Sequence, residues 1–302
     1  MSIRFRWLGT VCFEIVLPSG RVLIIDPYID YSTTAPVKSK DITGADYIAI
    51  THGDIDHITD IGTLAKKFNS TVICSHQLAE PFVKAFDLDR GSIIKVTAGN
   101  TIVFEDLRVE VKKAEHVGTT EPIRWDYEKL TGKKPSPALS LSQIQEEVRL
   151  IKNKQNIGYG SPEVTEMRNK LNAAGVVRGE MLNYVFQTSE NLRLYIFSAG
   201  TYDFLRSVVS EAHANVFFPQ LAGVYAENVA DFCILSGAEL IIPTHHDNFG
   251  IKGIRPLVQE LVRCLEKKSK SQVLNVVLGK WYELGVKVSP VIETEVKQKR
   301  RS

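Results

Sequence analysis

The stretch Asp46-Tyr-Ile-Ala-Ile-Thr-His-Gly-Asp-Ile-Asp-His57 joins a short apolar run to a loop rich in metal-ligand residue types. Residues 46–51 have the pattern of a buried strand. The loop holds two imidazoles and two carboxylates: His52, Asp54, Asp56 and His57. Such groups bind Zn, Fe or Mn ions. The spacing therefore predicts a metal-binding turn; the alternative is a polar loop whose carboxylates cap a helix starting near Ile58.

Two further histidines follow probable strands. His116 comes after Leu107–Lys112, and His245 comes after Leu240–Pro243. Because the ends of strands are where a scaffold brings side chains together, both histidines are expected to reach the same site. His246 is adjacent to His245, so one of the two can bind an ion while the other faces the substrate or packs.

Short strands and helices recur on both sides of residues 120–180. Strands are expected at 12–17, 21–26, 46–51, 71–74, 93–96, 101–104, 107–112, 181–188, 192–197, 215–218, 240–243, 273–278 and 281–286. Helices are expected at 60–68, 77–86, 142–154, 226–236 and 256–268. This alternation predicts a four-layer αββα sandwich of the α/β (α+β) class. Residues 120–180 contain four prolines and too few apolar residues for a core of their own. We therefore interpret them as a helical insertion within a single domain, 1–288. A basic tail, 289–302, follows this domain.

Composition narrows the function classes. The 302 residues carry 37 basic and 35 acidic side chains, so no whole-chain charge favours nucleic acid. The sequence has no apolar run of 18 residues and no secretory leader pattern, so we expect no membrane span. Four scattered cysteines without a CxxC pair indicate reduced thiols. We therefore expect a cytoplasmic protein.

The order of these motifs resembles the metallo-β-lactamase superfamily of metal-dependent hydrolases, whose signature loop is His-x-His-x-Asp-His. Within it the chain resembles the branch that contains L-ascorbate-6-phosphate lactonase. The segments that carry this second resemblance are Trp7-Leu-Gly9, Ile25-Asp-Pro-Tyr28, Phe218-Pro-Gln-Leu-Ala-Gly223 and Ile242-Pro-Thr-His-His-Asp-Asn-Phe249. The resemblance covers residues 3–118 and 181–286 and skips the insertion.

The resemblance implies a divalent metal centre with one or two ions, Zn first, with Mn or Fe as alternatives. By position, His52 and His116 would hold the first ion. The second ion would take the three ligands Asp56, His57 and His245. Asp26 would lie beneath the loop and orient a ligand. The resemblance also makes association into homo-oligomers an expectation.

Two positions depart from the superfamily pattern. The second histidine of the loop is Asp54, and the bridging aspartate of the fourth motif falls at Gly200. Asp54 adds an oxygen donor, which moves the preference toward Fe or Mn. Without the bridging aspartate, either hydroxide or Asp54 bridges two ions, or a single ion binds at the second position. Asp203 is a candidate substitute for the bridge; the alternative is an ordinary surface turn residue.

The resemblance favours a metal-dependent hydrolase that attacks a small ester, lactone or related substrate with metal-activated water. Asp54 or Asp56 would then orient the water or accept its proton. One alternative is an iron-containing, oxygen-activating or redox protein on the same scaffold. Another is a non-catalytic ligand-binding relative with a degenerate centre.

Further pocket candidates lie outside the metal motifs. The aromatic residues that could line a substrate wall are Tyr28, Trp125, Tyr127 and Tyr159; the alternatives are a half-buried aromatic for Tyr28 and, for the other three, anchors that hold the insertion to the body. The basic residues that could meet an anionic substrate are Arg124, Lys133, Lys134 and Arg178; the alternative is an ordinary solvated helical segment. For the insertion we weigh a lid or oligomer contact against a plain surface elaboration.

Overall fold

A computed structural model describes residues 2–117, 124, 127–128, 130–154, 161–247, 257–266 and 268–285. The expected basic tail, 289–302, and the pocket candidates Trp125 and Tyr159 lie outside the described residues. None of the helices within these ranges is long and apolar enough for a membrane span. The four cysteines are free.

The first sheet has seven strands in the order β14-β1-β2-β3-β4-β5-β6. Their bounds are Trp281–Gly285, Ser2–Gly9, Cys12–Val16, Val22–Ile25, Tyr47–Ala49, Thr71–Ser75 and Ile93–Val96. The strands from β14 to β3 pair antiparallel, and those from β3 to β6 pair parallel. The edge strand β14 thus comes from a segment remote in sequence, with Arg4 opposite Glu283.

The second sheet has the order β13-β12-β11-β10-β9-β8-β7. Its strands span Gln272–Val273, Leu240–Ile241, Val216–Pro219, Arg193–Phe197, Leu182–Thr188, Leu107–Lys113 and Thr101–Val103. The expected strand over 273–278 is wrong, since β13 is only two residues long. After Leu274, whose N–H still donates to the Ile241 carbonyl, the chain leaves the sheet and buries Val276 between the sheets.

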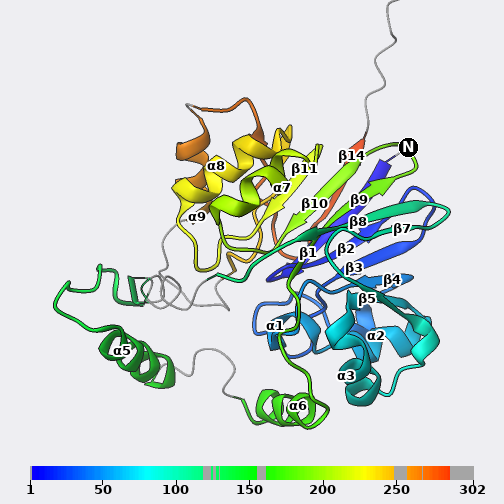
Figure 1. The fold of residues 1–302 in the computed structure, drawn as a ribbon, viewed down its shortest axis with the longest axis horizontal. Coiled ribbons are helices and arrows are strands. Elements are labelled where there is room, and N and C mark those ends of the chain that lie inside the picture. Colours follow the sequence, from blue (N-terminus) through cyan, green and yellow to red (C-terminus); the bar gives the residue numbers. More distant parts are fainter. Residues whose placement is uncertain are drawn as a thin grey trace, which may run out of the picture.

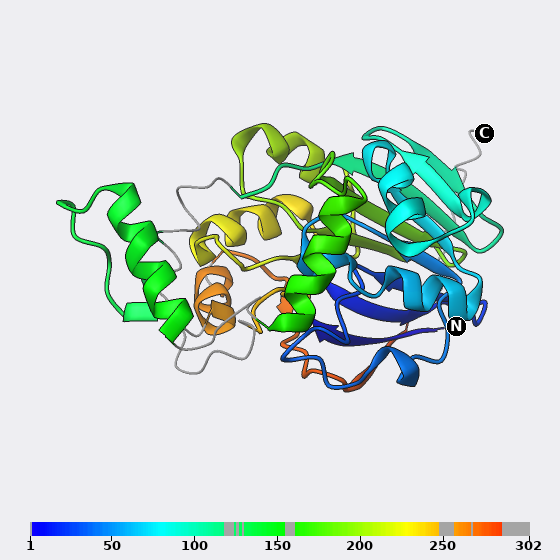
Figure 2. The ribbon, with the colours of Figure 1, turned by 90° about the horizontal axis from the view of Figure 1, so that it is seen from below.

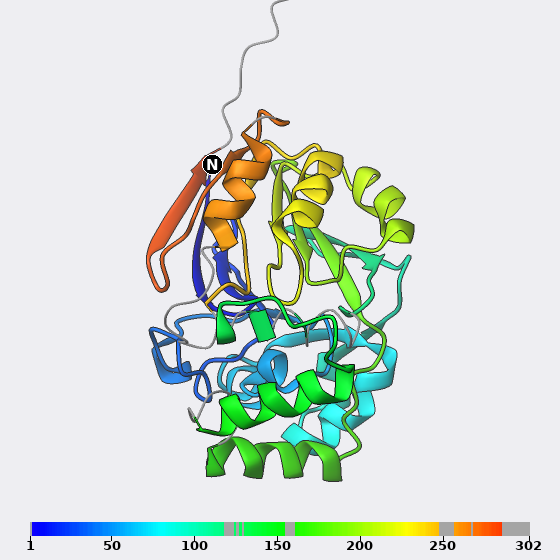
Figure 3. The same ribbon diagram turned by 90° about the vertical axis from the view of Figure 1, so that its left-hand side faces the viewer.

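Helices cover the outer face of each sheet (Figure 1, Figure 3). The first layer contains α1, α2, α3 and α6, which span Ile55–Ile58, Ile61–Phe68, His76–Phe86 and Pro162–Ala173. The second contains α7, α8 and α9, which span Arg206–Ser210, Ala226–Ser236 and Leu257–Leu265. In α2, Ile61, Leu64 and Ala65 share one buried face, as the helical spacing predicts. The four-layer αββα prediction is confirmed.

The inserted segment contributes one helix to this body. The sequence predicts a helix over 142–154, and α5 spans Leu141–Lys154, whereas the helix α6 is one that the sequence pattern does not predict. Leu171 at the end of α6 is buried in the same apolar cluster as Phe82 of α3. In Figure 1 and Figure 2, α6 lies against the body of the protein as part of the first helical layer, and α5 lies farther out.

The core between the sheets is aromatic. Phe218 of β11 contacts Phe13 edge-on, with ring centroids 5.2 Å apart, and Phe5 likewise, at 6.3 Å. All three side chains are fully buried. Edge-to-face packing of such rings stabilises an interface beyond the area that it buries.

An ion pair between β8 and β10 of the second sheet makes the free energy of unfolding depend on pH in the acid range. Arg193 donates from both terminal nitrogens to Glu110, at 3.0 and 3.2 Å. Partial burial opposes ionisation, but Arg193 and Lys112 outweigh it and lower the pKa of Glu110 from 4.5 to about 2. Because the folded-state pKa is lowered, the contribution to stability is present above about pH 4.5 and is lost as the pH falls toward 2.

We therefore expect Glu110→Gln to lower the free energy of unfolding by roughly 1 kcal/mol at pH 7, allowing for solvent screening. The difference from the wild type should shrink as urea titrations are repeated from pH 5 down to pH 3. Glu105→Gln is the matched control, because the Glu105 side chain is 87% exposed. A pH-independent difference at Glu110 would contradict the assignment.

Candidate metal centre

Three loops from both sheets meet at one end of the sandwich. Residues 50–54 follow β4 and lead into α1, residues 114–117 follow β8, and residues 242–247 follow β12. Gly200 lies near them, because its N–H donates to the carbonyl of Glu115 at 2.9 Å. Strand ends from both sheets thus bring side chains that are far apart in sequence to one place, as expected from their positions.

The structure groups six candidate ligands into two clusters. The first cluster is His52, Asp54 and His116, and the second cluster is Asp56, His57 and His245. Within each cluster the candidate ligand atoms lie within 4.8 Å of one another. The second cluster is buried throughout, whereas Asp54 and His116 of the first are partly exposed. The carboxylates do not cap a helix: α1 begins at Ile55, and the Asp54 side chain makes no cap hydrogen bond.

The spacing of the donor atoms fits a shared cation. The carboxylate oxygen Oδ2 of Asp54 lies 3.5 Å from Nε2 of His52 and 3.3 Å from Nε2 of His116. Oδ2 of Asp56 lies 3.6 Å from Nε2 of His57 and 3.4 Å from Nε2 of His245. Two ligands about 2.05 Å from a tetrahedral Zn ion would be about 3.4 Å apart. Both clusters therefore have the dimensions of a metal site.

Asp26 fixes the orientation of the two imidazoles in the loop. Its Oδ2 lies 2.8 Å from Nδ1 of His57 and accepts from the Thr51 hydroxyl at 2.6 Å. Because that hydroxyl gives its only hydrogen to Asp26, it accepts from Nδ1 of His52, 2.9 Å away. Both Nδ1 atoms are therefore protonated, and each Nε2 is the ring nitrogen left to bind a cation in the clusters.

The other two histidines are positioned by backbone. Nδ1 of His116 donates to the Val117 carbonyl at 2.9 Å, which leaves its Nε2 lone pair free for a cation. The N–H of His245 donates to the Thr10 carbonyl at 2.8 Å. Thr10, Asp26 and His245 all adopt positive φ angles, of +46°, +41° and +54°. Such backbone strain concentrates at functional sites, and the sequence patterns used above do not reveal it.

Burial and charge oppose each other in the loop. Burial lowers the pKa of His52 to about 4, and the nearby His57 charge adds to the effect. Burial also acts against a charged His57, but the carboxylates of Asp56 and Asp26 outweigh it and raise the pKa to about 9. For Asp54 and Asp56, burial favours the neutral form, yet the surrounding histidines lower each carboxyl pKa well below its ordinary range. The negative carboxylates and the positive His57 thus compensate one another in the buried loop.

Arg178, from the end of the insertion, binds Asp54. Its Nε lies 3.0 and 3.1 Å from the two carboxylate oxygens. The sequence placed Arg178 among candidate contacts to an anionic substrate and gave no sign of this pairing. The two residues are 124 positions apart, so no local pattern could reveal the contact.

The remaining candidates lie around the clusters. Tyr28 is 3% exposed and donates to the Tyr31 carbonyl, so it is a buried residue and not an open pocket wall. His246 stacks on Trp7, with ring centroids 4.4 Å apart. Asp203 is exposed in a short 3₁₀ turn and belongs to neither cluster.

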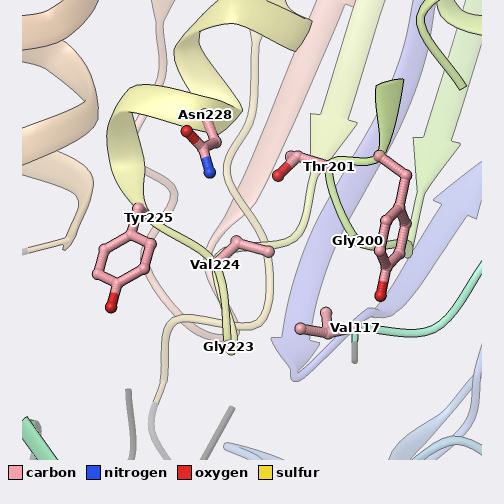
Figure 4. A pocket seen from close by; sticks show the side chains of 8 residues that line it. Val117, Gly200, Thr201, Gly223, Val224, Tyr225 and Asn228 are labelled. Atoms are coloured by element: carbon pink, nitrogen blue, oxygen red, sulfur yellow. The ribbon is translucent and has the colours of Figure 1, made fainter. Parts of the chain in front are cut away.

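A small cavity of about 60 Å³ lies next to the centre (Figure 4). Val117, which follows His116, lines it together with Gly200, Thr201 and Asn228. A Cβ atom at Gly200 would come within 2.6 Å of the Tyr202 ring, and the Tyr202 hydroxyl donates to the His116 carbonyl. The cavity therefore combines hydroxyl and amide groups with apolar surface beside the first cluster.

The backbone of Gly53 lies in close contact with the end of the insertion. Its N–H donates to the Arg178 carbonyl at 2.8 Å, and an added Cβ would lie 2.0 Å from the Val177 carbonyl oxygen. A backbone carbonyl cannot move away without disturbing its neighbours. We therefore expect Gly53→Ala to lower the free energy of unfolding by about 2 kcal/mol or more. Thermal unfolding would measure it, with Gly91→Ala as control, where a Cβ meets only ordinary contacts. Equal stability of the two variants would contradict this close approach.

Comparisons with known proteins agree with this architecture. Residues 21–141 match the family model of the beta-lactamase superfamily domain. A metallo hydrolase of the archaeon Ignicoccus hospitalis superposes with a TM-score of 0.64 at 14% identity, covering 95% of this chain and all of that one. A metallo-beta-lactamase fold protein of Bacillus subtilis gives 0.55 at 13% identity, covering 94% of this chain and all of that one. The chain has the metallo-β-lactamase fold, and its residues 21–141 are similar to the beta-lactamase superfamily domain.

The chain is also similar to curated proteins over part of its length. A UPF0173 metal-dependent hydrolase of Koribacter versatilis is 30% identical over 117 residues, which are 38% of this chain and 48% of the relative. The chain spans about half the length of the curated relatives it matches. The family match contains His52, His57 and His116 but ends before His245.

Proposed function

We propose that the chain is a metal-dependent hydrolase that acts on a small ester, lactone or related substrate. The observation that carries the proposal is the second cluster, in which Asp56, His57 and His245 are buried and mutually spaced for one cation. Asp26 supports it by holding His57 in the tautomer that a ligand needs. The UPF0173 relatives, which are named metal-dependent hydrolases, point the same way.

A divalent ion bound there would supply Lewis acidity and an activated water near neutral pH. The residues of the chain have separate tasks. Asp26 and Thr51 keep the imidazole Nε2 atoms directed into the site. Asp54 and Asp56 keep ionised carboxylates there, able to orient water. The cavity beside Val117 gives room for part of a substrate.

The finer assignments belong to the same proposal. The motifs shared with the lactonase-containing branch favour a lactone or ester over other substrates. Zn is the first expectation for the ion, and Mn or Fe is favoured to the extent that Asp54 takes part. A cytoplasmic location, a small-molecule substrate without nucleic acid, and homo-oligomeric association complete the proposed setting.

Chelator-sensitive hydrolysis tests the proposal. Purified protein is stripped of metal, then assayed against a panel of aryl esters and lactones before and after Zn²⁺ or Mn²⁺ is restored. We expect hydrolysis only with the ion present. Full hydrolysis after rigorous metal removal would overturn the proposal.

Asp54 in the first cluster is the observation that favours the oxygen-activating iron alternative, because it supplies an oxygen donor beside two histidines. Elemental analysis with visible spectroscopy separates the two functions: stoichiometric iron with a chromophore favours the iron protein. Protein that takes up no metal in supplemented medium would instead favour the non-catalytic relative.

A further inference from the structure

The two clusters differ in charge. In the first cluster, Asp54 contributes one negative charge, and its partner Arg178 contributes one positive charge, so their sum is zero. In the second cluster, Asp56 and the Asp26 that contacts His57 contribute two negative charges when His57 is neutral, as an imidazole that binds a metal must be. Asp26 reaches His52 only through the neutral Thr51 hydroxyl. A divalent cation is therefore attracted more strongly to the second cluster.

Arg178 competes with a cation for the same oxygen. Oδ2 of Asp54 is the atom nearest to the Nε2 atoms of both His52 and His116, and it is also 3.1 Å from Nε of Arg178. A cation bound in the first cluster would therefore share its one carboxylate with a guanidinium. Like charges so close repel, and the position where the resemblance expects a bridging aspartate is Gly200.

The guanidinium is fixed in place by its backbone. We call residues 176–182 the strap, since they run from the insertion to β9 across the metal loop. The strap bonds the loop twice, because Gly53 donates to the Arg178 carbonyl and Leu182 donates to the Thr51 carbonyl. Its first residue, Val176, is buried in the apolar cluster of the first helical layer. Arg178 is thus anchored on both sides, while its side chain remains 48% exposed.

We propose that Arg178 takes the electrostatic place of a second metal ion, so that the chain holds one divalent ion, in the second cluster. The inference rests on the proposed metal centre and specifies its composition. It also assigns the insertion a role: it delivers a fixed positive charge to the first cluster. A guanidinium cannot be lost by dialysis or chelation, so this charge is permanent.

Metal stoichiometry tests the inference without any activity assay. Metal-free wild type and Arg178→Gln are dialysed against Zn²⁺ or Mn²⁺, and bound metal is measured by elemental analysis and titration calorimetry. We expect one ion per wild-type chain. In Arg178→Gln we expect a second ion, with affinity at that site raised about tenfold or more after allowance for solvent exposure.

Matched variants test whether the effect of Arg178→Gln comes from the lost positive charge. Arg178→Lys keeps the positive charge and should still bind one ion. Lys170→Gln removes a positive charge from α6 of the same insertion, where the ammonium lies over the Phe86 ring, and should leave binding unchanged. The double variant Asp54→Asn/Arg178→Gln should return to one ion, because the second ion then lacks its carboxylate.

Two results would overturn the inference alone: two ions bound by the wild type with similar affinities, or no second ion in Arg178→Gln whose far-ultraviolet spectrum matches the wild type. A wild type that binds no ion at all would instead overturn the proposed metal centre, and this inference with it. The outcomes are therefore distinguishable.

Discussion

His57→Ala should abolish tight binding of a divalent ion, with a loss of affinity greater than about 100-fold, beyond the usual cost of losing a supporting residue. His57 is the imidazole between the two clusters: its ring centroid lies 4.0 Å from that of His52 and 5.7 Å from that of His245. Its loss removes a ligand and leaves the buried Asp26 carboxylate without one of its partners. Equilibrium dialysis with elemental analysis measures the effect, and hydrolysis should disappear in parallel.

The control for His57→Ala is His76→Ala. His76 is an exposed residue at the start of α3 and belongs to neither cluster. The His76→Ala variant should bind the divalent ion and hydrolyse the substrate as the wild type does. Should His57→Ala bind metal as the wild type does while remaining folded, the second cluster would not be the ion site.

Phe218→Ala should have the largest effect on stability, lowering the free energy of unfolding by about 3–5 kcal/mol. Phe218 is fully buried between the sheets and contacts the rings of Phe5 and Phe13. Truncation leaves a cavity that two sheets cannot readily close, because each is held by its own hydrogen-bond ladder. Urea unfolding followed by circular dichroism measures the change.

Phe204→Ala makes the same chemical change on the surface, where the side chain is 49% exposed. It should cost less than about 1 kcal/mol. Similar losses in the two variants would show that the stability of the fold does not depend on the aromatic core between the sheets.

The sequence predicted the layered fold because its strands are short apolar runs, each followed by a turn. Residues 46–51 and the loop up to His57 could be interpreted without knowledge of any partner, since strand and ligands are contiguous. The roles of His116 and His245 required only that strand ends converge. These features depend on local composition, which a single sequence displays directly.

What the sequence could not reveal depends on contacts between distant segments. The pairing of Arg178 with Asp54 links residues that no periodicity connects. The helix α6 was missed because its apolar positions are sparse and are buried only by docking on another layer. The φ angle of +54° at His245 is imposed by the hydrogen bond to Thr10 and its surroundings, and histidine itself gives no signal of it.

The pairing of β14 with β1 has a consequence for biosynthesis. Residues 2–6 emerge from the ribosome well before residues 281–285, which are their partners on one side. At usual elongation rates the interval between them is on the order of tens of seconds. During that time the outer edge of β1 offers unpaired backbone groups to any neighbouring chain. Neighbouring copies that are being translated from one messenger could therefore mispair at this edge, and holdase chaperones should bind the polypeptide before β14 has been made.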